Sequence, residues 1–301
     1  MKNLFFLVLM LVAAAASEKI DIDWSTVKPL QNYPEFWEGK PNKPPPKYFE
    51  QVKNYRIESR IANGNVAGRH DFPFMGALVS SMPFGGSLCG ASLISRWFVM
   101  TAASCLDGAS DTIIILGATD LNTPEQPFQA RWRVQAKNFI LHQNFRTGIT
   151  NSDIGLVRFN FEIAFFNQAV RPVPLPTDDM LNEDFAGQRT IVTGFGRESS
   201  TAINYSNVLR FTEVDTITPV ACRFAYPNLI DPSHICTNGI GGRGFCQGDL
   251  GAPLLIERNG GYIQIGIASD FDGGCSTNRP SVYTRMTSFA NWVRQQVGSF
   301  D

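Results

Sequence analysis

The sequence has few histidines and no excess of either charge. Its 301 residues include 3 histidines, and 26 basic side chains nearly balance 27 acidic ones, for a net charge of -1. A chain with so even a balance has no excess of basic surface, so the composition predicts neither a nucleic-acid partner nor binding to an anionic membrane. Hydrophobic residues make up 44% of the chain, which is enough to build a sizeable core.

Patterns that bind metals are also missing from the sequence. It has no Cys-x-x-Cys pair and no cluster of histidine with cysteine, so the cysteines do not suggest a zinc site. The loop 119–127 carries Asp120 and Glu125 but lacks the acidic cluster that a calcium site requires. The sequence therefore predicts no metal and no other cofactor.

Long apolar runs are confined to the start of the chain. Lys2, an apolar run over residues 4–12 and small residues at 13–17 are typical of a secretory signal peptide, here over residues 1–17. The run is too short to span a bilayer without the alanines where a signal peptidase would cut, so we favour this interpretation over a membrane anchor. We expect a secreted, extracellular protein with no membrane partner.

Secretion predicts covalent modifications. An even number of cysteines in an oxidising compartment indicates three disulfides, although spacing alone leaves their pairing open. The six cysteines are Cys89, Cys105, Cys222, Cys236, Cys246 and Cys275. Asn204, in an Asn-Tyr-Ser sequon within a loop rich in Ser, Thr and Asn, is a candidate glycosylation site.

Residues 18–60 differ from the rest of the chain. They contain no cysteine, have a Lys-Pro-Pro-Pro-Lys run at 43–47 and are rich in aromatic residues. Proline fixes φ and removes a backbone donor, so the region is predicted to be an extended pro-segment or linker. We favour a disordered arm that lies loosely on the main domain. The aromatic residues leave a docking peptide or packed pro-segment as the alternative.

From residue 61 to 301 the pattern is that of short strands. Residues 112–116 and 189–193 are β-branched and apolar between turn formers, and residues 93–101 form another mostly apolar run. Only the end has a helical pattern, an apolar stripe at i, i+3, i+4 and i+8 made by Phe289, Trp292, Val293 and Val297. Many strands followed by one terminal helix predict an all-β barrel or sandwich.

The most specific signal lies at 244–253, which reads Gly-Phe-Cys-Gln-Gly-Asp-Leu-Gly-Ala-Pro. It resembles Cys-x-Gly-Asp-Ser-Gly-Gly-Pro, the nucleophile loop of the chymotrypsin-like serine proteases (peptidase S1). Arg-Ile-Ala-Asn-Gly at 60–64, Thr-Ala-Ala-Ser-Cys at 101–105 and Asn-Ser-Asp-Ile-Gly-Leu at 151–156 resemble further motifs in the family's order. The resemblance covers residues 61–301 and implies two antiparallel six-stranded β-barrels with a cleft between them and a C-terminal α-helix. It also implies the disulfides Cys89–Cys105, Cys222–Cys236 and Cys246–Cys275.

Two positions of the family's catalytic triad are changed. Ser104 stands where the family has its general base, a histidine, and Leu250 where it has the serine nucleophile, while Asp153 keeps the third position. A serine hydroxyl does not titrate near neutral pH and leucine cannot attack a carbonyl, so we expect the chain not to be an enzyme. The backbone N–H groups of Gly248 and Leu250 would still form an oxyanion hole. The three histidines match no cleft position and are expected on the surface, at His70, His142 and His234.

Cleavage after Arg60 is a further implication of the resemblance. In the family the new α-amino group, here that of Ile61, enters the domain and pairs with the aspartate before the nucleophile, here Asp249. A buried ammonium needs a buried counter-charge, and both residue types are present. The alternative is an ordinary linker arginine together with a solvated aspartate.

The family's specificity pocket is changed as well. Gly244 takes the floor position, where trypsin-like members carry an aspartate, so a basic side chain would find no partner there. Ser269 keeps a wall position, while Phe271 and Ser281 replace glycines. We expect the Phe271 ring to narrow or plug the entrance. An elastase-like preference for small residues is the alternative.

Together these features predict a secreted, non-catalytic serine protease homologue that acts by binding protein. Its role would be that of a cofactor, regulator or decoy in a proteolytic cascade, switched by cleavage after Arg60. Its partners would be proteases, inhibitors or other cascade components. One alternative is a secreted S1-type serine endopeptidase with unusual or residual activity, and another is a structural or storage protein with no specific partner.

Overall fold

The computed structural model describes residues 20–40, 64–123, 129–147, 151–163, 168–199, 202, 204–270, 275 and 278–298. The first of its two sheets contains β1 (Val27–Pro29), β3 (Met75–Met82), β4 (Gly85–Leu93), β5 (Phe98–Thr101), β6 (Asp111–Leu116), β7 (Ala130–Gln135), β8 (Phe139–Leu141) and β9 (Gly155–Arg158). The second contains β2 (Asn65–Val66), β10 (Arg189–Gly194), β11 (Arg210–Ile217), β12 (His234–Thr237), β13 (Pro253–Arg258), β14 (Gly261–Asp270) and β15 (Ser281–Arg285). The α-helices are α2 (Pro219–Ala225) and α3 (Met286–Val297). Within these ranges no helix has the length and apolar character needed to cross a membrane.

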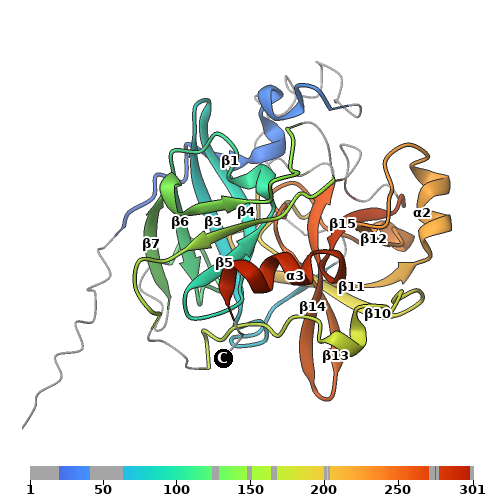
Figure 1. The fold of residues 1–301 in the computed structure, drawn as a ribbon. Coiled ribbons are helices and arrows are strands. Elements are labelled where there is room, and N and C mark those ends of the chain that lie inside the picture. Colours follow the sequence, from blue (N-terminus) through green and yellow to red (C-terminus); the bar gives the residue numbers. More distant parts are fainter. Residues whose placement is uncertain are drawn as a thin grey trace, which may run out of the picture.

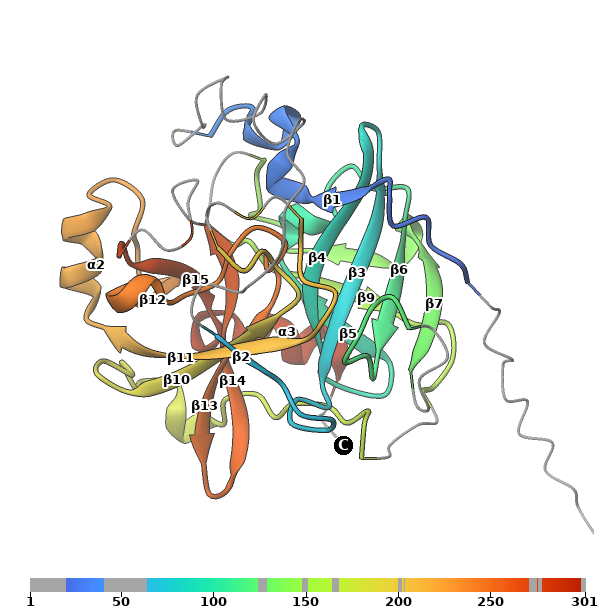
Figure 2. The ribbon, with the colours of Figure 1, turned by 180° about the vertical axis from the view of Figure 1, so that it is seen from behind.

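The two sheets lie side by side and are each barrel-like (Figures 1 and 2). The first has the order β7-β6-β3-β4-β5-β9-β8, with β1 added at β4. The second has the order β10-β13-β14-β15-β12-β11-β2, and an additional pairing of β10 with β11 closes it. Among the described strands, every pair is antiparallel except β1 with β4, which is parallel. The predicted all-β fold with two barrel-like sheets and a C-terminal helix is confirmed, but over the described residues the sheets have eight and seven strands where six were expected in each.

One local prediction was wrong, and one helix was not predicted. The apolar run 93–101 is not one strand, because β4 ends at Leu93 and the chain turns before β5. The turn is closed by the Ile94 N–H, which donates to the Phe98 carbonyl at 3.0 Å. Helix α2 was not predicted, since seven residues are too few to display a helical period. Its beginning follows local rules, because the Thr218 side chain caps the Ala221 N–H and Pro219 occupies the first turn.

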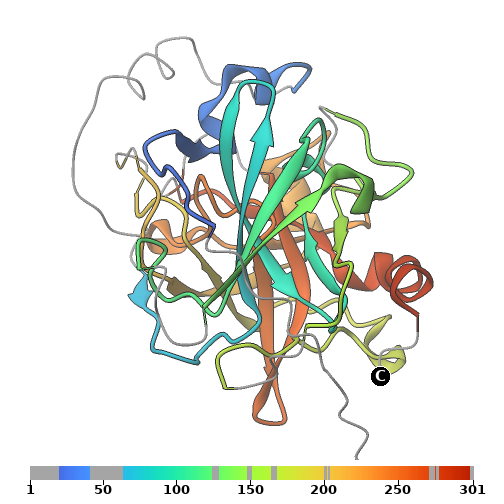
Figure 3. The ribbon, with the colours of Figure 1, turned by 90° about the vertical axis from the view of Figure 1, so that its left-hand side faces the viewer.

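Residues 20–40, which we call the N-terminal arm, are packed on the first sheet. Strand β1 pairs with residues 86–88 of β4, and Figure 3 shows the arm in blue alongside the β3–β4 hairpin. Leu30 and Trp37 are each 1% exposed and belong to the same hydrophobic core as the sheets. The expectation of a loosely lying, disordered arm is therefore wrong for these residues. The average composition of 18–60 conceals a few large apolar side chains that can be buried.

The structure contains three disulfides, Cys89–Cys105, Cys222–Cys236 and Cys246–Cys275, which are the pairs implied by the resemblance. Asn204 is exposed, so its side chain is accessible to modification. Its use as a glycosylation site stays a prediction. The signal region 1–17, the proline run 43–47, and both Arg60 and Ile61 lie outside the described residues.

Candidate functional site

The loop 244–253 is held at close range against the first sheet. Leu250 has no exposed surface, and its carbonyl accepts a hydrogen bond from the Gly90 N–H of β4 at 2.7 Å. The next residue, Gly251, has φ +83°. A Cβ on Gly251 would lie 2.1 Å from Thr101 Oγ1 and 2.3 Å from the Gly90 carbonyl oxygen. The loop thus requires glycine at 251 for both its conformation and its packing.

Replacing this glycine gives a first test of the loop's placement. We expect Gly251→Ala to lower the free energy of unfolding by about 3 kcal/mol or more, because strain at positive φ adds to a backbone clash. Gly260→Ala is the matched control, since Gly260 has φ +74° and nothing within 4 Å of its Cβ position. It should lose only about 1 kcal/mol. Urea unfolding compares the two, and equal losses would contradict the packing described.

The triad positions Ser104 and Asp153 are brought together, and Ser269 joins them. The Asp153 carboxylate accepts hydrogen bonds from the Ser104 N–H at 2.8 Å, the Ser104 hydroxyl at 3.0 Å and the Ser269 hydroxyl at 2.8 Å. Asp153 is 3% exposed, so these donors replace water. Ser104 and Asp153 are therefore in contact, with two hydroxyls and a backbone N–H around the carboxylate.

Asp249, within this loop, is buried. Its carboxylate accepts hydrogen bonds from the Gly196 N–H at 2.6 Å and the Cys246 N–H at 2.9 Å. Burial raises the pKa of Asp249 to about 7, and the two backbone hydrogen bonds only partly oppose that rise. A Cβ on Gly196 would lie 2.4 Å from this carboxyl group, so the pocket around it is fitted closely. The alternative of a solvated aspartate is wrong.

Three of the four pocket positions can be placed. Gly244, Ser269 and Ser281 are all buried. A Cβ on Gly244 would lie 2.5 Å from Ser281 Oγ, so these two positions meet as the resemblance implies. Phe271 lies outside the described residues, and the plug assigned to its ring stays a prediction.

Two of the three histidines are not on the surface, where the sequence placed them. His142 is 8% exposed and His234 is 3% exposed, so the expectation of surface positions is wrong for both. The His142 ring packs edge-on against Phe289 and Trp292 of α3, with ring centroids 5.1 Å apart in each pair. Burial lowers the pKa of His142 and keeps its ring neutral near pH 7. The tertiary contact with α3 could not be seen in the local sequence.

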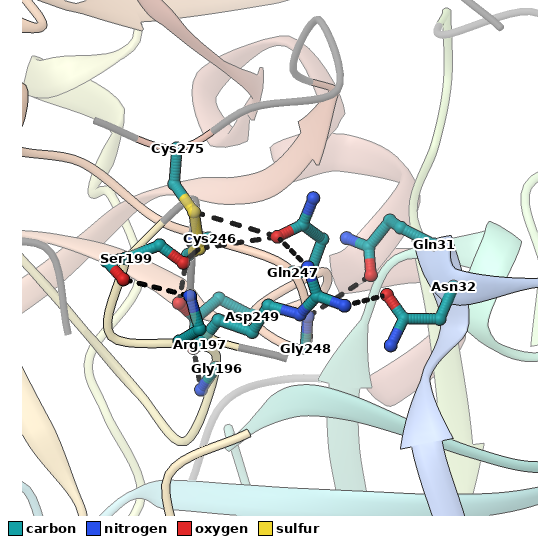
Figure 4. The surroundings of a disulfide bond; sticks show 11 residues. Gln31, Asn32, Gly196, Arg197, Ser199, Cys246, Gln247, Gly248, Asp249 and Cys275 are labelled. Carbon is teal, nitrogen blue, oxygen red and sulfur yellow. Dashed lines mark hydrogen bonds between the residues drawn. A yellow bond between two sulfur atoms is a disulfide. The ribbon is translucent and has the colours of Figure 1, made fainter. Parts of the chain in front are cut away.

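The N-terminal arm reaches the oxyanion-hole position. The Gly248 N–H donates to Gln31 Oε1 at 3.1 Å, and Gln31 has no exposed surface. Beside it, Arg197 Nη2 donates to Asn32 Oδ1 at 2.7 Å. Figure 4 shows both contacts next to the Cys246–Cys275 disulfide. One of the two backbone N–H groups expected to form the oxyanion hole, that of Gly248, is thus occupied by a side chain of the same chain.

The arm also encloses space beside the triad positions. A cavity of about 90 Å³ is lined by Leu30 and Phe36 from the arm, by Phe84 from the hairpin, and by Ser104 and Asp153. Tyr33 fixes this part of the arm, because its hydroxyl donates to the Gly86 carbonyl at 2.9 Å and its ring contacts Phe84. The arm therefore forms one wall of the cleft.

The residues that sequence reasoning missed are Gln31, Asn32 and Arg197. The hydrogen bond from Gly248 to Gln31 joins positions 217 residues apart, and no spacing rule connects them. The only sequence signal was the surplus of aromatic residues in 18–60, which left a docking peptide open as an alternative.

Comparison with known proteins gives the family. The family model described as trypsin matches residues 61–293. This chain belongs to the trypsin family. It is 32% identical over 244 residues to brachyurin of Leptuca pugilator, covering 79% of this chain and 99% of brachyurin. Chymotrypsin of Phaedon cochleariae is 28% identical over 255 residues, covering 83% of this chain and 88% of that protein. A solved structure titled HL collagenase has a TM-score of 0.70 and 26% identity, covering 78% of this chain and 98% of that one.

These relatives correct one expectation. The trypsin-family proteins matched here carry names such as chymotrypsin and collagenase, which are names of enzymes, so the expectation that the chain is not an enzyme is contradicted. That expectation rested on the side chains at 104 and 250 alone. The assignment of Ser104 and Leu250 to the triad positions stays a prediction from the resemblance.

Proposed function

We propose that this trypsin-family protein is secreted and binds a protein segment in its cleft, as a regulator of a proteolytic cascade. The observation that carries the proposal is the hydrogen bond from the Gly248 N–H to Gln31. Together with the β1–β4 pairing it supports the proposal, because a segment of this chain is held here through both backbone and side-chain hydrogen bonds. The three disulfides and the apolar N-terminal run support an extracellular setting.

Cleavage after Arg60 would switch this binding. Asp249 is buried with two backbone donors and a pKa raised to about 7, so it would gain most from a cation placed beside it. The α-amino group of Ile61, freed by cleavage, is such a cation. The segment 18–60 contains no cysteine, so after the cut only non-covalent contacts would keep it on the domain.

Capture from the native secretion tests the binding function. Immobilised chain, intact or cleaved after Arg60, is incubated with the secretion, and the retained proteins are identified by mass spectrometry. We expect a protease, an inhibitor or another cascade component to be retained by the cleaved form and not by an uncleavable Arg60→Gln form. Retention of no identifiable protein by either form would instead favour a structural or storage role.

Peptide hydrolysis is the second candidate function, because the matched relatives are named as proteases. The cleaved chain is assayed with peptide substrates and with a fluorophosphonate probe, which labels activated serines. Turnover accompanied by labelling of a serine in the cleft would establish the chain as a serine endopeptidase. Ser104→Ala identifies whether that serine is the one beside Asp153.

A further inference from the structure

We infer that the surface under residues 27–37 is a docking groove for an extended, acidic segment of a partner protein. The N-terminal arm is the occupant of this groove within the same chain. The inference rests on the proposed binding function and adds the chemistry of the partner. It is carried by three features of the groove: a strand edge, a pair of hydrogen-bond donors and an imperfect fit of the present occupant.

The strand edge is the first half of β4. Strand β5 pairs with β4 only at Ser92 and Leu93, so residues 86–88 offer their outer backbone groups to another segment. The arm uses this edge in a parallel register, with Val27 opposite Gly86 and Pro29 opposite Leu88. An open strand edge is a template for any extended peptide, whatever its sequence, because the hydrogen bonds are made by the main chain. The edge therefore offers a binding site for a strand but does not discriminate between partner sequences.

Glycine permits the close approach at this edge. A Cβ on Gly86 would lie 3.4 Å from Val27 Cγ2, and one on Gly85 would lie 2.7 Å from the Tyr33 hydroxyl oxygen. A side chain at 85 would thus force the Tyr33 side chain to move. The groove is shaped for an extended segment followed by a compact turn, as in the arm.

The two hydrogen-bond donors determine which side chain of a partner is preferred. Gly248 N–H and Arg197 Nη2 both point at the arm, where they bind the neutral oxygens of Gln31 and Asn32 (Figure 4). Arg197 is 1% exposed beneath the arm, so its guanidinium is screened from water. A carboxylate would bind such donors through charge-assisted hydrogen bonds, which are about twice as strong as neutral ones. The positive charge of Arg197 thus favours an acidic side chain over an amide.

The present occupant fits these donors imperfectly. Among the described residues, Gln31 Nε2 is buried and has no hydrogen-bond acceptor. A buried donor without a partner destabilises the bound state, because it has given up its hydrogen bonds to water. A glutamate at the same place would present two acceptor oxygens and no donor. The arm is therefore held by its tether as well as by its contacts, and an acidic segment can replace it once the tether is cut.

The covalent link between the arm and the domain controls whether a free peptide can replace the arm. While residues 41–60 connect the arm to the domain, the arm competes at an effective concentration on the order of millimolar, and a free peptide is excluded. Cleavage after Arg60 removes this advantage. The sequence Ile-Glu-Ser-Arg at 57–60 helps the experiment, because Ser59→Gly converts it to Ile-Glu-Gly-Arg, which a sequence-specific processing protease cuts.

The test uses the full chain with Ser59→Gly, before and after the cut, and fluorescent synthetic peptides of residues 20–40. Binding is measured by fluorescence anisotropy for the natural peptide and for peptides with Asn32→Asp or Asn32→Leu. We expect the cut chain to bind the Asn32→Asp peptide about tenfold more tightly than the natural one and the Asn32→Leu peptide about tenfold more weakly. The uncut chain should bind each peptide at least about a hundredfold more weakly than the cut chain does.

Arg197→Gln in the cut chain tests the origin of the preference. It should abolish the difference between the Asn32→Asp and natural peptides. If this variant does not fold, the dependence on salt serves instead, since the advantage of the Asn32→Asp peptide should shrink at high ionic strength. Equal affinity for these two peptides in the unmutated cut chain would overturn the acidic preference.

The outcomes separate this inference from the proposed function. A partner retained by the cleaved chain, together with equal peptide affinities, would leave the binding function standing and reject only the acidic chemistry. Failure of the cut chain to bind any of the peptides would reject the groove itself.

Discussion

The intact chain is expected to lose stability as the pH rises from about 4 to about 7, and the chain cleaved after Arg60 is expected to lose much less. The group responsible is Asp249, whose pKa is raised by burial from 3.8 to about 7. Between these two values the unfolded chain has released the proton and the folded chain still holds it. Because the folded state binds more protons, its stability is complete below pH 4 and falls until the pH passes 7.

The expected size of this loss is roughly 4 kcal/mol, since each pKa unit corresponds to about 1.4 kcal/mol. In the cleaved chain the α-amino group of Ile61 beside Asp249 would favour the ionised carboxylate and lower its pKa again, which removes most of the loss. Urea unfolding of both forms between pH 4 and 8 measures the effect. Asp249→Asn is the control, because it removes the titrating group and should flatten the profile of the intact chain. The same pH profile for intact and cleaved chains would contradict the proposed switch.

Trp37→Ala is expected to release the N-terminal arm while both sheets stay folded. Trp37 is 1% exposed, packs in the common core, and donates from Nε1 to the Gln31 carbonyl at 2.8 Å. Truncating a buried aromatic residue to alanine costs about 3–5 kcal/mol. The loss falls on the arm, because Trp37 fixes the carbonyl of the residue whose side chain binds Gly248.

Limited proteolysis measures this release. Cleavage within residues 27–37, followed by mass spectrometry, should be at least about a hundredfold faster in Trp37→Ala, since proteolysis of a locally opened segment follows its opening equilibrium. Trp97→Ala is the matched control, because Trp97 is 40% exposed and lies outside the arm, and it should leave the cleavage rate unchanged. An unchanged rate in Trp37→Ala, or unfolding of the whole domain, would show that the arm is not a separately held element.

The strands and the C-terminal helix could be predicted from the sequence, because their hydrophobic patterns lie within short stretches of the chain. The strands at 112–116 and 189–193 lie within β6 and β10, and the apolar stripe of Phe289, Trp292 and Val293 forms the buried face of α3. The positions assigned to Ser104 and Asp153, and to Gly244 and Ser281, came from the family resemblance, and the structure brings each pair together. The disulfide pairs followed from the family resemblance and not from spacing.

The features that the sequence analysis missed depend on contacts between residues that are far apart in the chain. His142 is buried because α3 packs over it, and neither segment shows this in its own pattern. The arm was misjudged because its proline and lysine content is that of a linker, while only a few of its apolar side chains join the hydrophobic core, Ile22, Val27, Leu30 and Trp37. Gln31 could not be linked to Gly248 without the fold. The family comparison in turn corrected the expectation of a non-enzyme, which had rested on two side chains.

The central claim is that the N-terminal arm occupies the cleft and covers the Gly248 N–H. Hydrogen exchange of the intact chain, read by mass spectrometry, tests it most directly. We predict slow exchange for peptides covering 27–37 and 246–250, and faster exchange of both together when Trp37→Ala releases the arm. Exchange of 27–37 at the rate of an unfolded chain, or no response of 246–250 to the release of the arm, would contradict the claim.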